Sequence, residues 1–392
     1  MKIIVHRGTK QIGGCATEIS TEKTRVLIDF GMQLPNLYGE NAKDNLKIEG
    51  VNKGLNRCDA IFFTHYHGDH IGLMSEVNPE IPMYIGALAK EIYLCLNKTL
   101  YKSEISMIEK LNTYRPIVPI KIGDLSITPI PTDHSACDAY MLLIEGDGKK
   151  VLHTGDFRLH GFTKERILAH LEKYVGKVDV LITEGTLFSR NDMSILSEYA
   201  IQDELKQIIE ENKYVFVLCS STNIDRLAML HNNTPPGKYF ICDAYQKEVF
   251  NIVAKARESS YYQFNKALTY GSNLPIREKG FVMAVRCNEW FKKMIAEYKD
   301  EATLIYSMWI GYVGEGVKDT KLKEFIGDYI QSGRMRVLHT SGHATKEAIG
   351  KVCEVVKPQY IIPIHTEQPE VAKELGMNIT VKLLNDEEVF EL

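Results

Sequence analysis

Paired cysteines are absent from this sequence. Its eight cysteines are scattered singly along 392 residues, with no CxxC pair; they are Cys15, Cys58, Cys95, Cys137, Cys219, Cys242, Cys287 and Cys353. This distribution excludes the disulfide-rich scaffolds that small secreted domains use. We therefore expect reduced thiols that are mostly buried.

Long apolar runs and an excess of basic charge are also lacking. No stretch approaches the roughly 18 apolar residues that a membrane-spanning helix needs, and residues 1–6 lead directly into a strand pattern. The formal net charge of −4 excludes an overall field that would attract nucleic acid or an anionic membrane. The sequence thus predicts a cytoplasmic protein with no membrane partner, in which any contact with a polyanion is local.

The composition is otherwise that of an ordinary globular protein. Hydrophobic residues make up 44% of the chain and charged residues 25%. This length and composition suffice for one large core or two modest ones, and we expect two lobes.

The first half alternates short β-rich runs with turn signals, which predicts a series of short strands. The predicted strands cover residues 2–5, 25–30, 60–64, 83–85, 126–129, 139–145, 151–154 and 178–183. Residues that can carry chemistry follow the ends of several of these runs.

After Arg190 the predicted strands alternate with helices. The strands cover residues 214–219, 239–242 and 303–308, and the helices that follow them cover residues 223–231, 246–257 and 321–331. This alternation implies a parallel α/β lobe. The pattern continues as strand 336–339, helix 345–357 and strand 360–363, with His365 just beyond.

The segment Thr-His-Tyr-His-Gly-Asp-His at residues 64–70 directly follows an apolar strand. In an extended segment, residues two apart project to the same side, so His65 and His67 can bind one ion together. The loop that follows would present Asp69 and His70 to a second ion. Imidazole and carboxylate suit zinc, manganese and iron, and the spacing does not choose among them. The alternative, a solvated polar loop, does not account for three histidines and an aspartate in this pattern.

Two further candidate ligands lie near other predicted strand ends. His134 follows the run 128–133, and Asp156 follows the run 152–155. Either residue alone would be interpreted as a capping or turn residue. Together with the histidine-rich segment, a carboxylate bridging two ions about 3.5–4 Å apart is what a hydrolytic two-metal site needs to activate water.

With these motifs the sequence resembles the metallo-β-lactamase superfamily. The superfamily motifs are matched by Asp29 in Leu-Ile-Asp-Phe-Gly, by the run at 65–70, by His134 and by Asp156. The resemblance implies two divalent ions, most readily Zn²⁺, with Mn²⁺ as the alternative. The implied ligands of one ion are His65, His67 and His134, and those of the other are Asp69, His70 and His365. Asp156 would lie between the ions, and Asp29 would orient ligand side chains from behind.

The downstream motifs resemble the β-CASP branch of this superfamily, and within it ribonuclease J. Glu184 at a strand end resembles the acidic motif A, His343 in Ser-Gly-His-Ala motif B, and His365 in Pro-Ile-His-Thr-Glu motif C. In this family a histidine at motif C goes with RNA substrates, so His365 implies RNA as the partner. Ribonuclease J more often has an aspartate at motif A and usually continues into a C-terminal domain that helps assemble oligomers. This chain ends soon after motif C, so a homodimer is left open.

The resemblance also implies the fold class. It is an α/β protein with a four-layer αββα metallo-β-lactamase sandwich and an inserted parallel α/β β-CASP domain. We expect the first part of the sandwich domain at residues 1–195, the insertion at 196–338, and the completion of the sandwich, with motifs B and C, at 339–392. An RNA cleft would lie between the two lobes.

The implied activity is hydrolysis of RNA phosphodiester bonds, in RNA processing or decay, by a water molecule that two metal ions activate. Exonuclease action from the 5′ end, endonuclease action and both together are open. The candidate catalytic residues are His343, Asp69 and Glu184. His343 would protonate the leaving 3′ oxygen, because a histidine pKa lies near the operating pH, and Glu184 would hold its orientation. The competing interpretation is that His343 only binds a phosphate oxygen or supports a ligand.

Two polar runs that precede predicted helices are candidate phosphate sites, because amides at a helix N-terminus attract anions. They consist of Ser220, Ser221, Thr222 and Asn223, and of Ser341, Gly342 and Ala344 around His343. The alternative is that both runs only cap their helices.

Two other functions remain open at the sequence level. One is a metallo-hydrolase of a small ester or thioester, against which the insertion with motifs B and C counts. The other is a non-catalytic RNA-binding subunit, against which the filled ligand positions count.

Overall fold

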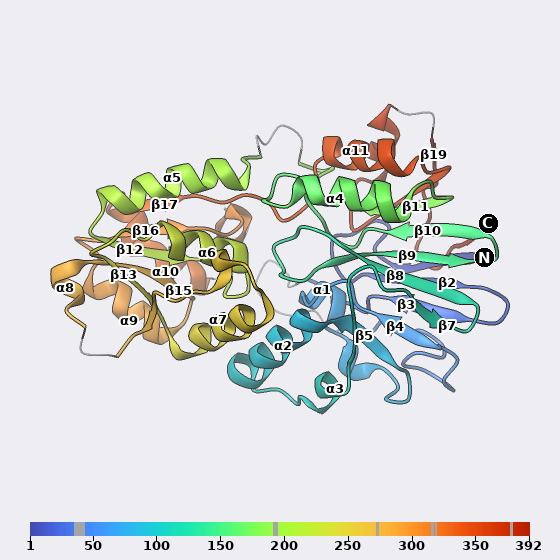
Figure 1. The fold of residues 1–392 in the computed structure, drawn as a ribbon, viewed down its shortest axis with the longest axis horizontal. Helices are drawn as coiled ribbons and strands as arrows, with labels where there is room; N and C mark the ends of the chain where they lie inside the picture. The colour runs from blue at the N-terminus through green and yellow to red at the C-terminus, as the bar shows by residue number, and fades with distance from the viewer. Residues whose placement is uncertain (35–43, 191–194, 272–273, 315–316, 318–319, 377–378) are drawn as a thin grey trace. The chain divides into compact units, whose positions relative to one another are not determined.

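The computed structural model describes residues 1–34, 44–190, 195–271, 274–314, 317, 320–376 and 379–392. These residues fall into two compact units. The first contains the described residues of 1–34, 44–190 and 342–392, and the second contains those of 195–341. Figure 1 labels the elements of both units.

Two seven-stranded sheets form the first unit (Figure 1). In order across the first sheet the strands are β20 (Val389–Glu391), β1 (Lys2–Arg7), β2 (Ala16–Ser20), β3 (Arg25–Ile28), β4 (Ala60–Phe62), β5 (Met83–Gly86) and β6 (Asn112–Tyr114). Across the second they are β19 (Thr380–Val381), β18 (Tyr360–Ile364), β11 (Val180–Glu184), β10 (Lys149–His153), β9 (Tyr140–Gly146), β8 (Leu125–Pro131) and β7 (Ile120–Ile122).

Apolar side chains from both sheets share one buried core. Ile28 and Phe62 of the first sheet belong to the same cluster as Leu142 and Ile182 of the second. Successive side chains of a strand point to opposite faces, so one face of each sheet supplies this core.

Helices cover the outer faces of the two sheets. On the second sheet, α4 (Lys164–His170) and α11 (Lys346–Val356) bury Ile167 and Val352 in a further apolar cluster. On the first sheet, α2 (Ala87–Leu96) packs against β5 and β6, beside α3 (Ser106–Glu109). The first unit is therefore a four-layer αββα sandwich, which confirms the predicted α/β fold class.

The second unit is built on a six-stranded sheet in which every pairing is parallel. The strand order is β14 (Ala267–Thr269), β13 (Tyr239–Cys242), β15 (Phe281–Val285), β12 (Tyr214–Leu218), β16 (Thr303–Tyr306) and β17 (Met335–Val337). Its helices are α5 (Glu198–Glu211), α6 (Ile224–Asn233), α7 (Ala244–Ala256), α8 (Ile276–Lys279), α9 (Glu289–Glu297) and α10 (Thr320–Gln331). Strands such as β12 are buried at every position, as expected where helices cover both faces of a parallel sheet.

Some elements were missed at the sequence level. Neither β2 nor the pair formed by β15 and α9 was predicted. The residues of β2, Ala-Thr-Glu-Ile-Ser, include few apolar ones, and β15 is a short apolar run whose periodicity does not reveal its secondary structure. Gly68 begins a one-turn helix, α1 (Gly68–Ile71), where a loop was expected. No helix among the described residues is long and apolar enough to cross a membrane.

Candidate metal centre

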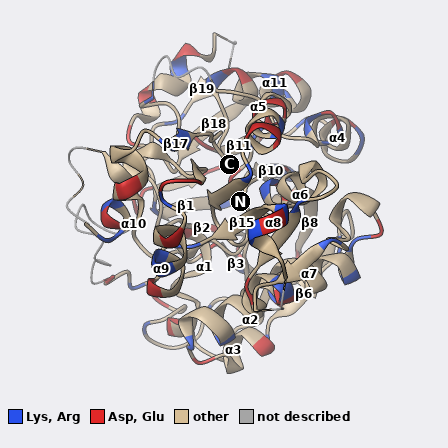
Figure 2. Ribbon diagram, turned by 90° about the vertical axis from the view of Figure 1, so that its left-hand side faces the viewer, with Lys and Arg blue, Asp and Glu red and all other residues tan. Residues whose placement is uncertain are grey.

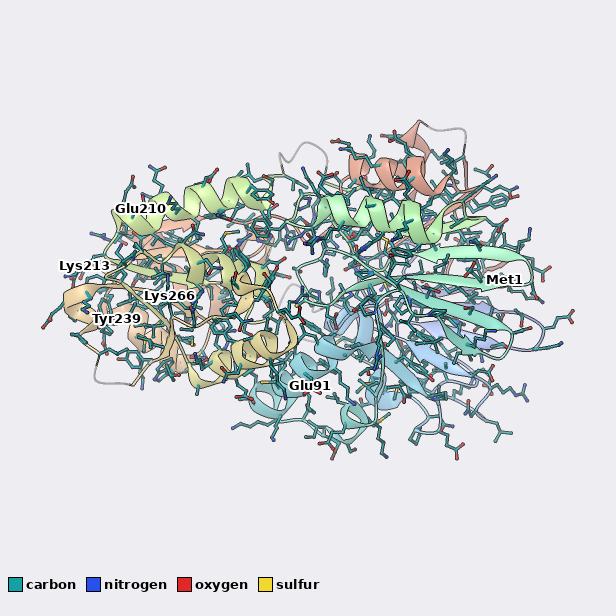
Figure 3. All side chains as sticks on the ribbon, in the orientation of Figure 1. Met1, Glu91, Glu210, Lys213, Tyr239 and Lys266 are labelled. Atoms are coloured by element: carbon teal, nitrogen blue, oxygen red, sulfur yellow. The ribbon has the colours of Figure 1, made fainter. Side chains whose placement is uncertain are left out.

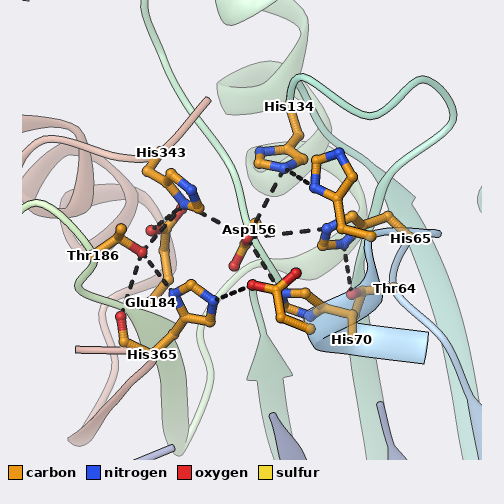
Figure 4. Close-up of polar contacts among 12 residues, drawn as sticks. Thr64, His65, His70, His134, Asp156, Glu184, Thr186, His343 and His365 are labelled. Atoms are coloured by element: carbon orange, nitrogen blue, oxygen red, sulfur yellow. Dashed lines mark hydrogen bonds and ion pairs between the residues drawn. The ribbon is translucent and has the colours of Figure 1, made fainter. Parts of the chain in front are cut away.

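The candidate site lies within the first unit, where the carboxyl ends of several strands meet. In the second sheet β10, β11 and β18 run parallel, so Asp156, Glu184 and His365 come from neighbouring strand ends. His65 and His70 follow β4 of the first sheet. Figure 4 shows these side chains converging from both sheets.

Three histidines form the first part of the cluster. The ligand atoms of His65, His67 and His134 lie within 4.8 Å of one another. His134 Nε2 lies 3.1 Å from His67 Nδ1, so the two nitrogens face the same point. The structure thus brings together the first of the two predicted ligand groups.

Asp156 lies at the centre of the cluster. Its Oδ2 is 3.2 Å from His70 Nε2, 3.5 Å from His343 Nδ1, 3.9 Å from His134 Nε2 and 4.0 Å from His65 Nε2. One carboxylate therefore reaches histidines of both predicted ligand groups (Figure 4).

The second predicted group also comes together, with an unexpected neighbour. His365 Nε2 lies 3.1 Å from Asp69 Oδ2. The ligand atoms of Cys15, His70 and His365 lie within 4.8 Å of one another. Sequence reasoning assigned Cys15 only as a buried thiol, because nothing in the spacing from residue 15 to residue 70 indicates their proximity.

Three buried polar atoms of the cluster have no hydrogen-bond partner within the described part of the chain. They are His65 Nε2, His70 Nε2 and Asp156 Oδ1. Burying such an atom without a partner lowers the free energy of unfolding by about 1–3 kcal/mol. Native folds rarely keep such an atom unless a ligand binds it. Nitrogen and carboxylate donors in this number fit divalent metal ions.

Asp29 supports the cluster from behind. Its carboxylate accepts hydrogen bonds from the Thr64 amide at 2.7 Å, from the Thr64 hydroxyl, and from His70 Nδ1 at 2.8 Å. Because Nδ1 of His70 donates to Asp29, Nε2 is the nitrogen that faces Asp156, 3.2 Å away. Asp29 is thus placed to orient His70.

Thr186 was missed at the sequence level, although it contacts two of the histidines. Its hydroxyl lies 2.7 Å from His365 Nδ1 and 3.2 Å from His343 Nδ1. Since His365 Nε2 faces Asp69, a proton on Nδ1 would be donated to Thr186. The only sequence signal was the position of Thr186 two residues after Glu184, at a strand end.

Glu184 connects three parts of the site. One carboxylate oxygen lies 3.0 Å from His343 Nδ1, and the other accepts hydrogen bonds from the amides of Phe157 and Ala344. The Ala344 amide is therefore used within the protein. Glu184 holds the His343 ring and the loop after β10 together.

A buried ion pair that sequence reasoning missed joins two ligand-bearing loops. Arg158 Nε donates to Asp133 Oδ1 at 2.6 Å, and both side chains are almost fully buried. The Arg158 amide also donates to the Asp133 carbonyl oxygen. The pair thereby fixes the loop with His134 against the loop with Asp156.

Burial keeps the first group of imidazoles neutral. It lowers the pKa of His65 and of His134 well below the usual histidine value, and it lowers the pKa of His67 to about 4. Neutral imidazoles have the lone pairs that a metal ion requires.

His343 differs from those histidines. Burial alone would lower its pKa, but the negative charges of Glu184 and Asp156 outweigh burial and raise the pKa to about 9. His343 is therefore protonated near neutral pH when the cluster contains no ions.

The two polar runs are placed as follows. Asn223 accepts a hydrogen bond from the Arg226 amide and caps α6. Ser220 is exposed, whereas Ser221 and Thr222 are buried. Ser341 is the last residue of the second unit, and Gly342 begins the last segment of the first, where its carbonyl accepts from His134 Nδ1.

Two protein-family models match the sequence. Residues 24–217 match a β-lactamase superfamily domain, and residues 330–383 match the Zn-dependent metallo-hydrolase RNA specificity domain. Among curated proteins, ribonuclease J of Helicobacter pylori strain B128 is 24% identical over 95% of this chain, which spans 57% of that protein. Ribonuclease J 2 of Streptococcus pyogenes is 22% identical over 95% of this chain and 71% of its own length.

The fold is also similar to solved structures, one of which matches over its whole length. It is a protein of unknown function from Enterococcus faecalis V583, with a TM-score of 0.80, 21% identity, and coverage of 100% of this chain and 99% of that one. At this identity the likeness concerns the fold alone.

The pKa of His343 leads to a prediction for the ion-free protein. Its imidazole should stay protonated at neutral pH and lose the proton near pH 9. The folded-state pKa is raised above the ordinary 6.5, so protonated His343 stabilises the folded protein. Its contribution to the free energy of unfolding is complete below pH 6.5 and is lost as the pH rises through about 9. Glu184→Gln removes the largest attractive charge and should lower this pKa.

An NMR titration of the histidine ring protons after chelation measures this shift. Glu374→Gln is the matched control, because Glu374 pairs with Lys346 at the exposed surface. If His343 titrates at the same pH in the Glu184→Gln and control proteins, Glu184 is not the cause of its raised pKa.

Proposed function

We propose that this chain, which belongs to the metallo-β-lactamase superfamily and to its β-CASP branch, is a metal-dependent ribonuclease acting in RNA processing or decay. The observation that carries the proposal is the buried cluster of histidines and carboxylates around Asp156, whose unpaired atoms face one another. The match of residues 330–383 to an RNA specificity domain and the likeness to proteins named ribonuclease J support RNA as the substrate.

The proposed ligands fall into two groups. His65, His67 and His134 would hold one ion, and Asp69, His70 and His365 the other, with the Asp156 carboxylate shared between them. We propose Zn²⁺ as the native metal, with Mn²⁺ as the alternative, since both accept these donors. Two bound cations would activate water for attack on the phosphodiester and offset the charge of the phosphate.

His343 is the proposed general acid. Its Nδ1 faces Glu184, so we assign the proton for the leaving 3′ oxygen to Nε2. Glu184 orients the ring, and Thr186 contacts the same nitrogen from the side. A proton held at Nε2 and a fixed ring are the two properties that an acid in this position needs.

We propose phosphate contacts for each of the two polar runs separately. At the start of α6, the exposed hydroxyl of Ser220 and the backbone amide of Ser221 would be the donors. The amides of Thr222 and Asn223 already donate to Ser220. Ser341 and Gly342 precede His343 in the other run, whereas the Ala344 amide already donates to Glu184.

The proposal extends to organisation and location. Residues 1–195 and 339–392 would form the metal-binding domain, and residues 196–338 an inserted domain that contacts RNA. The eight cysteines, all within the described residues, form no disulfide, which suits the reducing cytoplasm in which we place the protein. Assembly as a homodimer would be compatible with this role.

Incubation with defined nucleic acids tests the proposed function. Protein loaded with zinc or manganese should hydrolyse RNA faster than DNA of the same sequence. RNAs with a 5′ monophosphate, with a 5′ triphosphate and with a circular backbone separate exonuclease from endonuclease action, since only an endonuclease opens the circle. Hydrolysis of small thioesters but not of any RNA would contradict the proposal.

Metal content gives a second prediction. The purified chain should bind close to two divalent ions, because the proposed ligands are too many for one tetrahedral ion. Asp156→Ala removes the shared carboxylate, so at least one ion should be lost. Glu145→Ala, a half-buried carboxylate on β9 that pairs with Lys150, is the control and should keep both ions. Elemental analysis that finds only trace metal after reconstitution would refute the ligand assignment.

His343→Ala separates acid catalysis from metal binding. If His343 is the general acid, single-turnover cleavage at saturating RNA should slow by about 10²–10⁴-fold while the metal content stays unchanged. A phosphate-binding role instead predicts weaker RNA binding with a smaller change in maximal rate. A variant with a near-normal maximal rate, or one that has lost its ions, would exclude the acid role.

A further inference from the structure

The carboxyl edge of the six-stranded sheet bears four aromatic side chains that the proposed metal site does not use. Tyr270 directly follows β14, and Trp290 lies in the first turn of α9, which follows β15. Trp309 and Tyr312 follow β16, at the short helix Ile310–Val313. Because all strands of this sheet are parallel, these strand ends lie on one edge. We call the four residues the carboxyl-edge aromatics.

These rings are exposed to an unusual degree. The exposed fractions are 38% for Tyr270, 44% for Trp290, 36% for Trp309 and 54% for Tyr312. Among the described residues seven aromatic side chains are this exposed, and four of them are the carboxyl-edge aromatics. The four include both tryptophans of the chain. Single exposed aromatics are ordinary, but several on one edge indicate a binding surface.

The four rings form two supported pairs. Tyr270 and Trp290 meet edge to face, with centroids 5.4 Å apart, and Trp309 and Tyr312 do so at 5.3 Å. In the sheet one strand separates β15 from β16, which places their ends about 10 Å apart at two strand spacings. An edge-to-face contact holds both rings in place, while each ring keeps the exposed fraction given above.

Gly311 shows that the Trp309 ring has a defined position. A Cβ at residue 311 would lie 2.3 Å from the Trp309 ring, so only glycine lets the ring rest on this backbone. Trp309 is therefore held by the local fold.

Polar and cationic groups lie along the same edge. Arg286 follows β15, with its guanidinium 4.8 Å from the centre of the Tyr245 ring, and it pairs with Asp243. Helices α6, α7 and α9 begin at this edge, so their N-termini direct partial positive charge towards it. Figure 2 shows Lys and Arg interspersed with Asp and Glu along the helices.

We propose that the carboxyl-edge aromatics are a stacking surface for the bases of single-stranded RNA. Proteins that bind single strands without sequence preference combine flat aromatic faces with positive potential. Every base has a face that can stack on such a ring. A protein partner would favour a continuous apolar patch. The only aliphatic side chain in the described part of the segment 309–313 that is exposed beside these rings is Ile310, and the partly exposed ion pair of Arg286 and Asp243 lies along the same edge. The choice of RNA as the polymer rests on the proposed function, but the stacking surface itself does not depend on catalysis.

The two tryptophans allow a direct test with the full chain. The probe is a short oligouridine, added in the presence of a chelator so that it stays intact, with a gel to verify this. Trp290→Phe leaves Trp309 as the sole tryptophan, and Trp309→Phe leaves Trp290. The oligomer should quench the tryptophan fluorescence of both variants, because each remaining indole would stack on a base.

Alanine variants measure the contribution to binding. Trp290→Ala and Trp309→Ala should each weaken oligouridine binding roughly 5- to 100-fold, whereas the phenylalanine variants retain most of the affinity. An abasic oligomer of the same length should bind all these proteins equally. The controls are Tyr101→Ala, an exposed tyrosine of the first unit, and Lys213→Ala, at the opposite, amino edge of the sheet (Figure 3); both should bind like the unaltered chain.

Three results would overturn the inference. They are binding without quenching, alanine variants that weaken the abasic and base-containing oligomers alike, and sedimentation showing self-association that Trp290→Ala abolishes. The last result would identify the edge as a contact between copies of the chain. If quenching occurs but no RNA is cleaved after metal loading, only the proposed catalytic function fails. If RNA is cleaved but no quenching occurs, only this inference fails.

Discussion

The carboxylate of Asp156 is almost completely buried and has imidazole nitrogens from four histidines within 4.0 Å. Such a group is stable in a protein interior only if positive charge compensates it. Hydrogen bonds to Asp29 and to the Gly342 carbonyl turn His70 and His134 so that their other nitrogens face inwards. The sandwich of two sheets brings the strand ends together at this point, and the need for compensating charge explains why bound cations suit it.

The backbone beside the site adopts a conformation that the sequence would not lead one to expect. Asp29 and His365 have φ angles of +60° and +52°, and each directly follows the last residue of a strand, β3 or β18. For residues other than glycine this left-handed region costs roughly 1–2 kcal/mol. The surrounding structure must supply that energy. Both residues therefore hold their side chains at the cluster in a conformation that an isolated peptide would rarely populate.

The sequence was informative where neighbouring residues act together and uninformative where folding brings partners together. The run at residues 64–70 was recognisable because its spacing is itself a ligand pattern, and the strand-helix alternation after Arg190 predicted the parallel sheet. Thr186 and Arg158 were not recognisable, because their partners His365 and Asp133 lie 179 and 25 residues away. Strand β15 was missed because five apolar residues fit a helix or a strand equally well.

The pairing of β1 with β20 closes the first sheet with strands from opposite ends of the sequence. Translation runs from the N-terminal side, so β1 leaves the ribosome long before β20, and β12 to β17 are made in between. His65, His134 and Asp156 are likewise made well before His343 and His365. The order of translation thus delays assembly of the complete cluster until the segment with His343 and His365 has emerged. A ribosome-bound fragment that ends within the second unit cannot contain the finished centre.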